Sequence, residues 1–173
     1  MIVKCCFTTH SIGRTRCLDL STSTMPHHRR ADLLEAATRF CNAFSAQKPL
    51  EELLEYFAPT ESVALEHGLP QLAPFLGREF RGREGVREYF ETVSRLLTYQ
   101  DMRFGDYVVD AAERRVAVRG QARFRWTATN QAWDEVFAYI LVFDVDHKIQ
   151  KYEVWADSGA AYLASQGLLT ASS

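Results

Sequence analysis

Residues 114–129 read RRVAVRGQARFRWTAT, and apolar and polar side chains alternate along most of this stretch. One set of positions holds valine, alanine and aromatic residues, and the other holds arginine and glutamine. This period of two is typical of a strand with one covered face. The same reasoning predicts strands at 102–109, 132–146 and 149–155. The strand at 132–146 is apolar on both faces over 136–145, which indicates a central strand that is covered twice. We expect a homodimer to cover the second face.

The N-terminal half has helical spacing instead. Apolar residues predict a helix over 31–44, a short helix that starts at Pro49, and a third helix over 85–97. A short strand, ESVALEHG (61–68), separates the second helix from the third. The segment LPQLAPFLGREFRG (69–82) holds two prolines and two glycines and is predicted as a loop, although an unusually apolar one that must cover something. Helices followed by an antiparallel meander predict an α+β fold with helices on one face of a curved sheet.

Composition and charge describe one domain with a polar N-terminal extension. The chain has 173 residues, of which 47% are hydrophobic, enough for a single core. Of its 20 basic and 22 acidic residues, five basic and one acidic lie in 1–30, which leaves 15 and 21 in the remainder. An acidic domain has no electrostatic reason to bind nucleic acid. No apolar run approaches the ~20 residues needed to span a membrane, and we expect a soluble protein without membrane partners.

The domain limits follow from this change of character. We expect a basic tail at 1–29, either disordered or upstream of an alternative start at Met25, a domain at 30–167, and a short tail at 168–173. Residues 1–24 are rich in Ser, Thr and basic groups, so a mitochondrial transit peptide is the alternative to the cytoplasmic location that we expect. Cys5, Cys6 and Cys17 lie in this stretch at spacings that match no zinc site, and a disulfide framework is not expected.

The last strand raises a question about its faces. The stretch KIQKYEVWADSGAAYL (148–163) carries Glu153, Trp155 and Asp157 at alternate positions. A solvated face would leave the tryptophan out of place, and a core face would bury two acids. If Ile149 and these three residues face a concave surface, Trp155 walls a pocket and the acids lie toward its mouth. Lost hydration would then raise the pKa of such a carboxylate toward neutrality and suit it to proton transfer.

At this point the chain resembles the nuclear transport factor two-like superfamily, and within it the SnoaL-like branch. The resemblance covers about residues 31–165 and is carried by the N-terminal helices, the helix start GREGVREYF (82–90) and the strands that end in KIQKYEVWAD. The stretches EHGLPQLAPFLGREFRG (66–82) and YEVWAD (152–157) are also similar to small fungal SnoaL-like proteins. The resemblance implies a cone-shaped, mainly antiparallel sheet that wraps around three N-terminal helices and encloses an apolar pocket.

The resemblance also implies a chemistry. In enzymes of this superfamily an Asp, Glu or His inside the pocket moves a proton next to a carbonyl, or activates water, without metal or organic cofactor. Asp157 matches the Asp that commonly ends the last strand, and Glu66 and His67 fall near the first strand, where isomerase relatives place a carboxylate base. These three residues are the catalytic candidates. The candidates for ligand binding are Trp155, Trp126, Tyr139, Phe124, Phe75, Phe57, Tyr89 and Glu153.

Each candidate has a plainer alternative. Asp157 could cap the SGAAYLASQ segment, Glu153 could be an ordinary polar neighbour or pair with an arginine across the sheet, and His67 could be a loop histidine. Glu66 and His67 cannot both face the pocket on a regular strand. The turn at 130–132 could have two or three residues, which leaves open whether Trp126 and Tyr139 share a face. We expect a cofactor-free cyclase or isomerase that acts on a hydrophobic carbonyl compound. The alternative is a non-catalytic dimeric protein that binds an apolar ligand.

Overall fold

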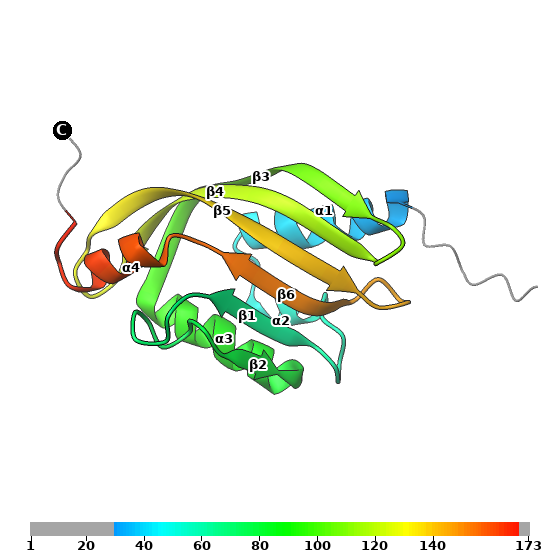
Figure 1. The fold of residues 1–173 in the computed structure, drawn as a ribbon, viewed down its shortest axis with the longest axis horizontal. Coiled ribbons are helices and arrows are strands. Elements are labelled where there is room, and N and C mark those ends of the chain that lie inside the picture. Colours follow the sequence, from blue (N-terminus) through cyan, green and yellow to red (C-terminus); the bar gives the residue numbers. More distant parts are fainter. Residues whose placement is uncertain (1–29, 170–173) are drawn as a thin grey trace, which may run out of the picture.

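The structure is a computed structural model and describes residues 30–169 (Figure 1). The predicted N-terminal tail lies outside these residues, as do residues 170–173. Four helices and six strands make up the described part, in the order α1 (Arg30–Ser45), α2 (Leu50–Leu54), β1 (Val63–His67), β2 (Glu79–Arg81), α3 (Gly82–Leu96), β3 (Leu97–Asp110), β4 (Arg115–Trp126), β5 (Ala132–Phe143), β6 (Ile149–Trp155) and α4 (Ser158–Ser165).

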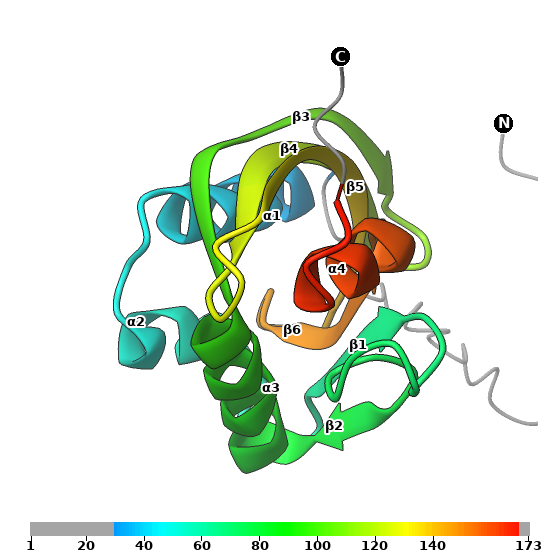
Figure 2. The ribbon, with the colours of Figure 1, turned by 90° about the vertical axis from the view of Figure 1, so that its left-hand side faces the viewer.

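The strands form one sheet with the order β2-β1-β6-β5-β4-β3. Strands β1 and β6 run parallel, and all other neighbouring strands run antiparallel. The sheet curls, and α1, α2 and α3 lie on its concave side (Figure 2). Helix α1 packs on β3 and β4, while α3 packs on β1, β2 and β3. The predicted α+β class and curved, mainly antiparallel sheet are confirmed. Within residues 30–169, no helix is long and apolar enough to cross a membrane.

Aromatic side chains fill the space between the first helices and the sheet. Phe40 of α1 makes edge contacts with Phe57 and with Tyr152 of β6, with ring centroids 5.7 and 5.8 Å apart. All three side chains are almost completely buried. This packing follows from the helical spacing in α1, because Leu33, Ala37 and Phe40 fall on one face of the helix.

The turn between β4 and β5 fixes which residues share the inner face. The Trp126 N–H donates to Gln131 O and the Asn130 N–H donates to Trp126 O, so residues 127–130 form the turn. This loop is longer than the two or three residues expected from the sequence. Phe124 therefore lies opposite Trp133 in the sheet, and Trp126 shares the inner face with Tyr139.

A β-bulge in β6 corrects the predicted faces of the last strand. Lys151 pairs with Val142 and Ile149 pairs with Phe143, so Gln150 is an extra residue without a partner in β5. The bulge shifts the alternation by one position. Ile149 still points inward, but after the bulge the buried residues are Tyr152 and Val154. The prediction that Glu153 and Trp155 face the concave side is wrong, because it assumed regular alternation from Ile149 onward.

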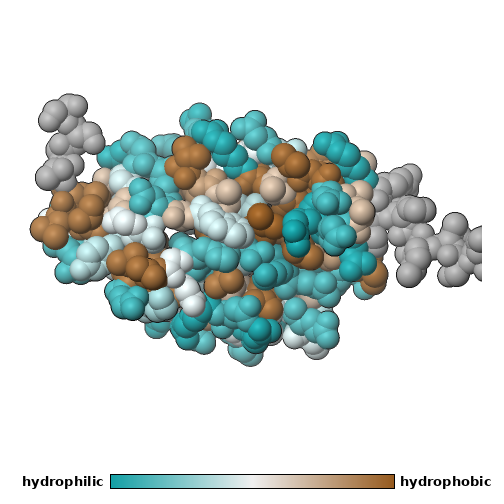
Figure 3. Space-filling model, viewed as in Figure 1, coloured by the Kyte–Doolittle hydropathy of each residue, from teal (hydrophilic) through white to brown (hydrophobic). Residues whose placement is uncertain are grey.

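The outer face of the sheet is partly apolar. Val136 of β5 and Val108 of β3 are 57% and 68% exposed, and arginines of β4 lie between them. In the space-filling view, hydrophobic residues are interspersed with hydrophilic ones on the face shown (Figure 3). The homodimer stays a prediction.

Candidate active site

A cavity of about 340 Å³ lies between the inner face of the sheet and helices α2, α3 and α4. Most of its wall is aromatic or aliphatic, and most of its polar groups are carboxyls and tyrosine hydroxyls. The wall includes Lys48, Glu66, Phe75, Leu76, Tyr89, Tyr99, Phe124, Trp133, Glu135, Phe137, Tyr139, Tyr152, Val154, Asp157 and Ala161.

Glu66 is one of the carboxyls of this wall. It lies on the inner face of β1, where it pairs with Val154 of β6. The Tyr89 hydroxyl of α3 donates to Glu66 Oε2 over 2.6 Å. Glu66 keeps some surface open to the cavity, yet protein surrounds it, and this burial raises the pKa of its carboxyl from 4.5 to about 7. The Tyr89 hydrogen bond opposes the increase, and the charge of Glu135 adds to it. Glu66 can therefore gain or lose a proton near neutral pH.

The apolar segment 69–82 covers Glu66. Leu76 forms an isolated bridge with Glu66, and the Gly77 N–H donates to Glu66 O over 2.8 Å. Gly77 has a φ of 67°, and a Cβ there would lie 2.5 Å from Gly68 O, so this close approach requires glycine. Phe75 and Leu76 thereby become part of the cavity wall. The segment covers the cavity as its composition suggested, although its last part forms β2 rather than loop.

Glu135 is a second buried carboxyl in the cavity, and sequence reasoning missed it. Its Oε2 accepts from Trp133 Nε1 over 2.6 Å, and its Oε1 accepts from the Asp157 N–H over 2.7 Å. Burial raises the pKa of Glu135, the two donors lower it, and the charge of Asp157 raises it again. The available signal was an acid two residues after a tryptophan, on a strand whose other residues apart from Asp134 are apolar. This signal could not place Glu135 in the cavity, because the length of the turn at 130–132 decides which residues of β5 point inward.

Three tyrosines continue the wall from Glu66. Tyr139 and Tyr152 are in edge contact at 4.9 Å, and Tyr89 lies 6.0 Å from Tyr152. Burial raises the pKa of all three hydroxyls well above 10, so they remain protonated and can donate hydrogen bonds. Tyr152 is close enough to influence the pKa of both Tyr89 and Tyr139. The cavity therefore presents neutral donors beside Glu66.

Asp157 lies at the rim of the cavity. It is the N-cap residue of α4, and its Oδ1 accepts from the Ala160 N–H over 2.9 Å. This is the capping alternative considered for Asp157 from the sequence. The residue is exposed, but its backbone N–H reaches into the cavity to Glu135.

His67 does not line the cavity, because it follows Glu66 on a regular strand and points to the other face. There its ring stacks on Trp155, with centroids 4.0 Å apart and an interplanar angle of 16°. His67 Nε2 lies 3.3 Å from Glu153 Oε1, and Lys151 Nζ lies 2.9 Å from the same oxygen. We call His67, Trp155, Glu153 and Lys151 the outer cluster. The predicted placement of His67, Trp155 and Glu153 in the pocket is wrong, because all three side chains lie on the outer face of the sheet.

The other predicted ligand-binding residues divide into two groups. Tyr139, Phe124, Phe75 and Tyr89 lie in the cavity wall. Trp126 and Phe57 are buried on the concave side of the molecule but are not part of the wall. The structure adds wall residues that the sequence did not single out, namely Trp133, Phe137 and Tyr152.

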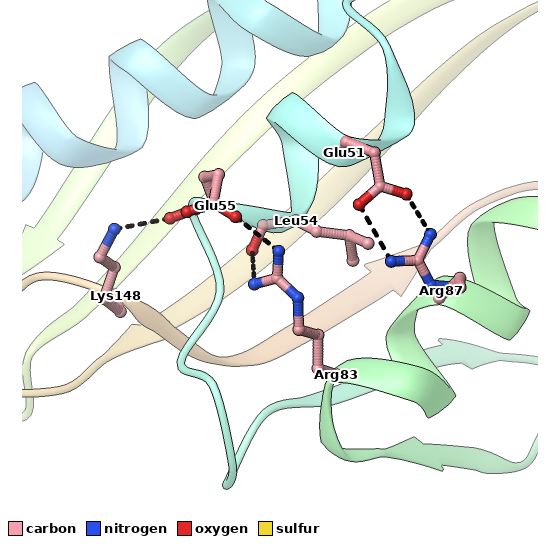
Figure 4. A network of polar contacts seen from close by, with 6 residues as sticks. All are labelled: Glu51, Leu54, Glu55, Arg83, Arg87 and Lys148. Carbon is pink, nitrogen blue, oxygen red and sulfur yellow. Dashed lines mark hydrogen bonds and ion pairs between the residues drawn. The ribbon is translucent and has the colours of Figure 1, made fainter.

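Charged pairs hold α2, which forms part of the wall, against α3 and the turn before β6 (Figure 4). Arg87 of α3 binds the carboxylate of Glu51, with Nη2 3.0 Å from Oε2. Arg83 Nη2 lies 2.5 Å from Glu55 Oε1, and Lys148 Nζ donates to Glu55 O over 2.6 Å. The acidic partners of Arg87 and Arg83 are largely exposed, so each pair contributes little to stability alone. Together they fix the position of a helix of only five residues.

The cavity contains acids and hydroxyls rather than a metal cluster. Among residues 30–169, no group of three or more His, Cys, Asp or Glu side chains could hold a metal ion.

The sequence matches the model of a known protein family. The model of the SnoaL-like domain matches residues 37–152, most of the described chain. The chain belongs to the SnoaL-like family. The predicted relationship to this branch of the nuclear transport factor two-like superfamily is confirmed. No curated protein sequence matches the chain.

Solved structures share the fold of this SnoaL-like chain at low sequence identity. PrhC from Penicillium brasilianum is 21% identical, with a TM-score of 0.60, and the match covers 80% of this chain and 95% of PrhC. AusH from Aspergillus nidulans is 18% identical, with a TM-score of 0.58 and coverage of 75% and 86%. A nuclear transport factor two-like protein from Burkholderia xenovorans is 17% identical, with a TM-score of 0.63 and coverage of 79% and 98%. At these identities the likeness shows the fold.

Proposed function

We propose that this SnoaL-like protein is a cofactor-independent enzyme of the cyclase or isomerase type that transfers protons on a neutral, hydrophobic carbonyl compound. The observation that carries the proposal is Glu66, a carboxyl in an apolar cavity whose side-chain partner is the neutral hydroxyl of Tyr89. A carboxyl held for structural reasons is usually paired with a cation or capped by several N–H groups. Glu66 has neither partner among the described residues.

The cavity wall favours a neutral substrate over an anionic one. Its acids are Glu66, Glu135 and Asp157, and its one cation among the described residues is Lys48. The Lys48 side chain is half exposed and pairs with Glu52 at 3.4 Å, so it provides no buried site for an anion. A carboxylate or phosphate ester in the cavity would lose hydration and meet like charges. Aromatic faces and tyrosine hydroxyls suit a ring system that carries carbonyl groups.

The proton transfer follows from Glu66 and the tyrosine hydroxyls beside it. Ionised Glu66 takes a proton from the carbon next to the substrate carbonyl, the C–H bond breaks, and its electron pair moves toward the carbonyl oxygen. A tyrosine hydroxyl of the cavity wall donates a hydrogen bond to that oxygen and stabilises the developing enol. Glu66 then returns its proton to another carbon in an isomerisation. In a cyclisation, the enol carbon instead attacks a second carbonyl of the same molecule, whose oxygen takes up a proton.

The test is hydrogen–deuterium exchange of β-tetralone, a neutral bicyclic aromatic ketone, followed by NMR in D₂O. The wild-type protein should accelerate exchange next to the carbonyl, and Glu66→Gln should reduce this acceleration by roughly 10²- to 10⁴-fold, the usual contribution of a general base. Glu153→Gln is the matched control, because it removes a carboxylate from the opposite face of the sheet. It should leave the rate unchanged.

Two results would contradict the proposal. Equal acceleration by wild type and Glu66→Gln would remove Glu66 from the chemistry. Saturable binding of β-tetralone, measured by tyrosine and tryptophan fluorescence, with no acceleration of exchange would favour the alternative, a protein that only binds apolar ligands.

A further inference from the structure

Helix α4 and the segment before it close the open end of the curled sheet (Figure 2). Residues Ala156, Asp157, Ser158 and Ala161 contribute to the cavity wall there. The far end of α4 is tied to the turn between β4 and β5, because the Thr129 hydroxyl donates to Ala164 O over 2.6 Å. Contacts therefore hold α4 at both ends, and at its start they centre on Asp157.

The backbone of Asp157 makes a second contact from the same position. Its N–H donates to Glu135 Oε1 over 2.7 Å, while its own side chain accepts from the Ala160 N–H. Trp133 Nε1 holds the other oxygen of Glu135. Both oxygens of this buried carboxyl are thus fixed by donors from two different elements, β5 and the junction of β6 with α4.

We propose that Asp157 is a positioning residue that couples the position of α4 to the orientation of Glu135, the second carboxyl of the cavity. This role rests on the proposed proton transfer. Asp157 caps α4 at the rim of the cavity, and its backbone N–H holds the carboxyl of Glu135 in the wall. A displacement of the chain at Asp157 would therefore release Glu135.

The charge of Asp157 affects the pKa of Glu135 in the opposite direction to its backbone N–H. Its backbone N–H favours ionised Glu135, whereas its carboxylate disfavours it. The other titratable groups of the cavity are Glu66 from β1, Tyr89 from α3, Tyr99 from β3, Tyr139 from β5, Tyr152 from β6 and Lys48 before α2. Glu66 and Glu135 also oppose each other's ionisation. The proposed chemistry requires ionised Glu66, and the charge of Glu135 makes this ionisation harder.

The substitution Asp157→Asn separates the two effects. Asparagine caps helices about as well as aspartate and retains the backbone N–H, but it carries no charge. The variant should therefore keep α4 folded and lower the pKa of Glu135. Asp157→Ala removes the charge and the cap together.

The experiment is a pH titration of Glu135 by NMR in protein labelled with ¹³C at the glutamate carboxyls, with the signal assigned by its loss in Glu135→Gln. Asp157→Asn should lower the titration midpoint of Glu135. Asp134→Asn is the matched control, because Asp134 precedes Glu135 but pairs with Arg123 on the outer face. In this variant the titration midpoint of Glu135 should equal that in wild type. Asp157→Ala should make amide exchange at Ala160 and Ala161 roughly fivefold faster, as expected for a lost cap.

Equal Glu135 midpoints in Asp157→Asn and Asp157→Ala would overturn the positioning role, because only alanine removes the cap that holds the Asp157 N–H against Glu135. Unchanged amide exchange in Asp157→Ala would overturn it as well. These readouts need no substrate. Failure of the proposed function would appear separately, as β-tetralone exchange that does not depend on Glu66.

Discussion

Glu66 and His67 are consecutive residues of β1, yet they occupy two different chemical environments. Glu66 points into the cavity and is held by one neutral hydroxyl, that of Tyr89. His67 points to the outer face, stacks on Trp155 and lies beside Glu153. By residue type alone the histidine is the better proton carrier at neutral pH. The structure places the carboxyl in the site instead.

In β1, the face of the strand determines whether a side chain can take part in proton transfer, more than the kind of side chain does. The inner face removes water and provides neutral donors, which brings the pKa of Glu66 to about 7. On the outer face, an acid such as Glu153 has Lys151 and His67 beside it. Variants matched across the two faces therefore test whether the environments differ in this way.

The largest contrast should appear in the pH dependence of stability. Because the folded-state pKa of Glu66 is raised from 4.5 to about 7, its contribution is fully present below pH 4.5 and is lost as the pH rises through about 7. The shift corresponds to up to about 3 kcal/mol. Glu66→Gln should abolish this slope and become more stable, relative to wild type, as the pH increases. Urea unfolding of both proteins from acidic to mildly alkaline pH measures the difference.

The outer-face variant Glu153→Gln controls for the loss of a carboxylate. Its stability difference from wild type should not follow the same slope. If wild type and Glu66→Gln gave parallel stability curves over this range, Glu66 would not be buried in the way described, and the comparison of the two faces would fail.

The second contrast concerns the backbone under the aromatic wall. Gly120 lies on the inner face of β4, where a Cβ would come within 2.2 Å of the Phe137 ring. Gly120→Ala should force this ring to shift and cost about 1–3 kcal/mol, the usual effect of overpacking. Gly105 of β3 has no atom within 4 Å of a Cβ position, so Gly105→Ala should be neutral or slightly stabilising. Thermal unfolding of both variants tests the pair; equal destabilisation would contradict it.

These faces explain how much the sequence could predict. Alternation in β4 predicted its inner and outer residues, because that strand is regular from Val116 to Trp126. Helical spacing likewise predicted the helices that fill the concave side. Strand β6 defeated the same method, since the bulge at Gln150 reverses the phase and no residue type marks it.

The site was harder to predict than the fold, because it depends on pairings between strands. Glu66 could be singled out, but its face could not be separated from that of His67 without the phase of β1. Glu135 stayed hidden because the turn length sets which residues of β5 point inward. Burial of each acid is a property of all surrounding elements, and no local pattern contains it.

A third contrast compares two tyrosine hydroxyls. Tyr89 donates to Glu66, whereas Tyr99 donates to Phe44 O over 2.7 Å. The Tyr89 hydrogen bond favours ionised Glu66, so Tyr89→Phe should raise the pKa of Glu66 above about 7 and move the pH profile of β-tetralone exchange upward. Tyr99→Phe loses a comparable hydrogen bond and should leave the profile in place. The profiles of both variants, with ¹³C NMR of Glu66, measure this; a common shift would mean that the effect is general loosening.

The smallest effect is expected where the sequence placed its best proton carrier. His67→Ala removes a ring that is partly exposed, together with its contacts to Trp155 and Glu153. The contact between His67 and Glu153 is long, at 3.3 Å, and Lys151 still pairs with Glu153 after the substitution. The unfolding free energy should therefore fall only slightly, and β-tetralone exchange should equal that of wild type. A large loss of exchange in a folded His67→Ala protein would mean that the outer cluster takes part in the chemistry, and the separation of the two faces would have to be abandoned.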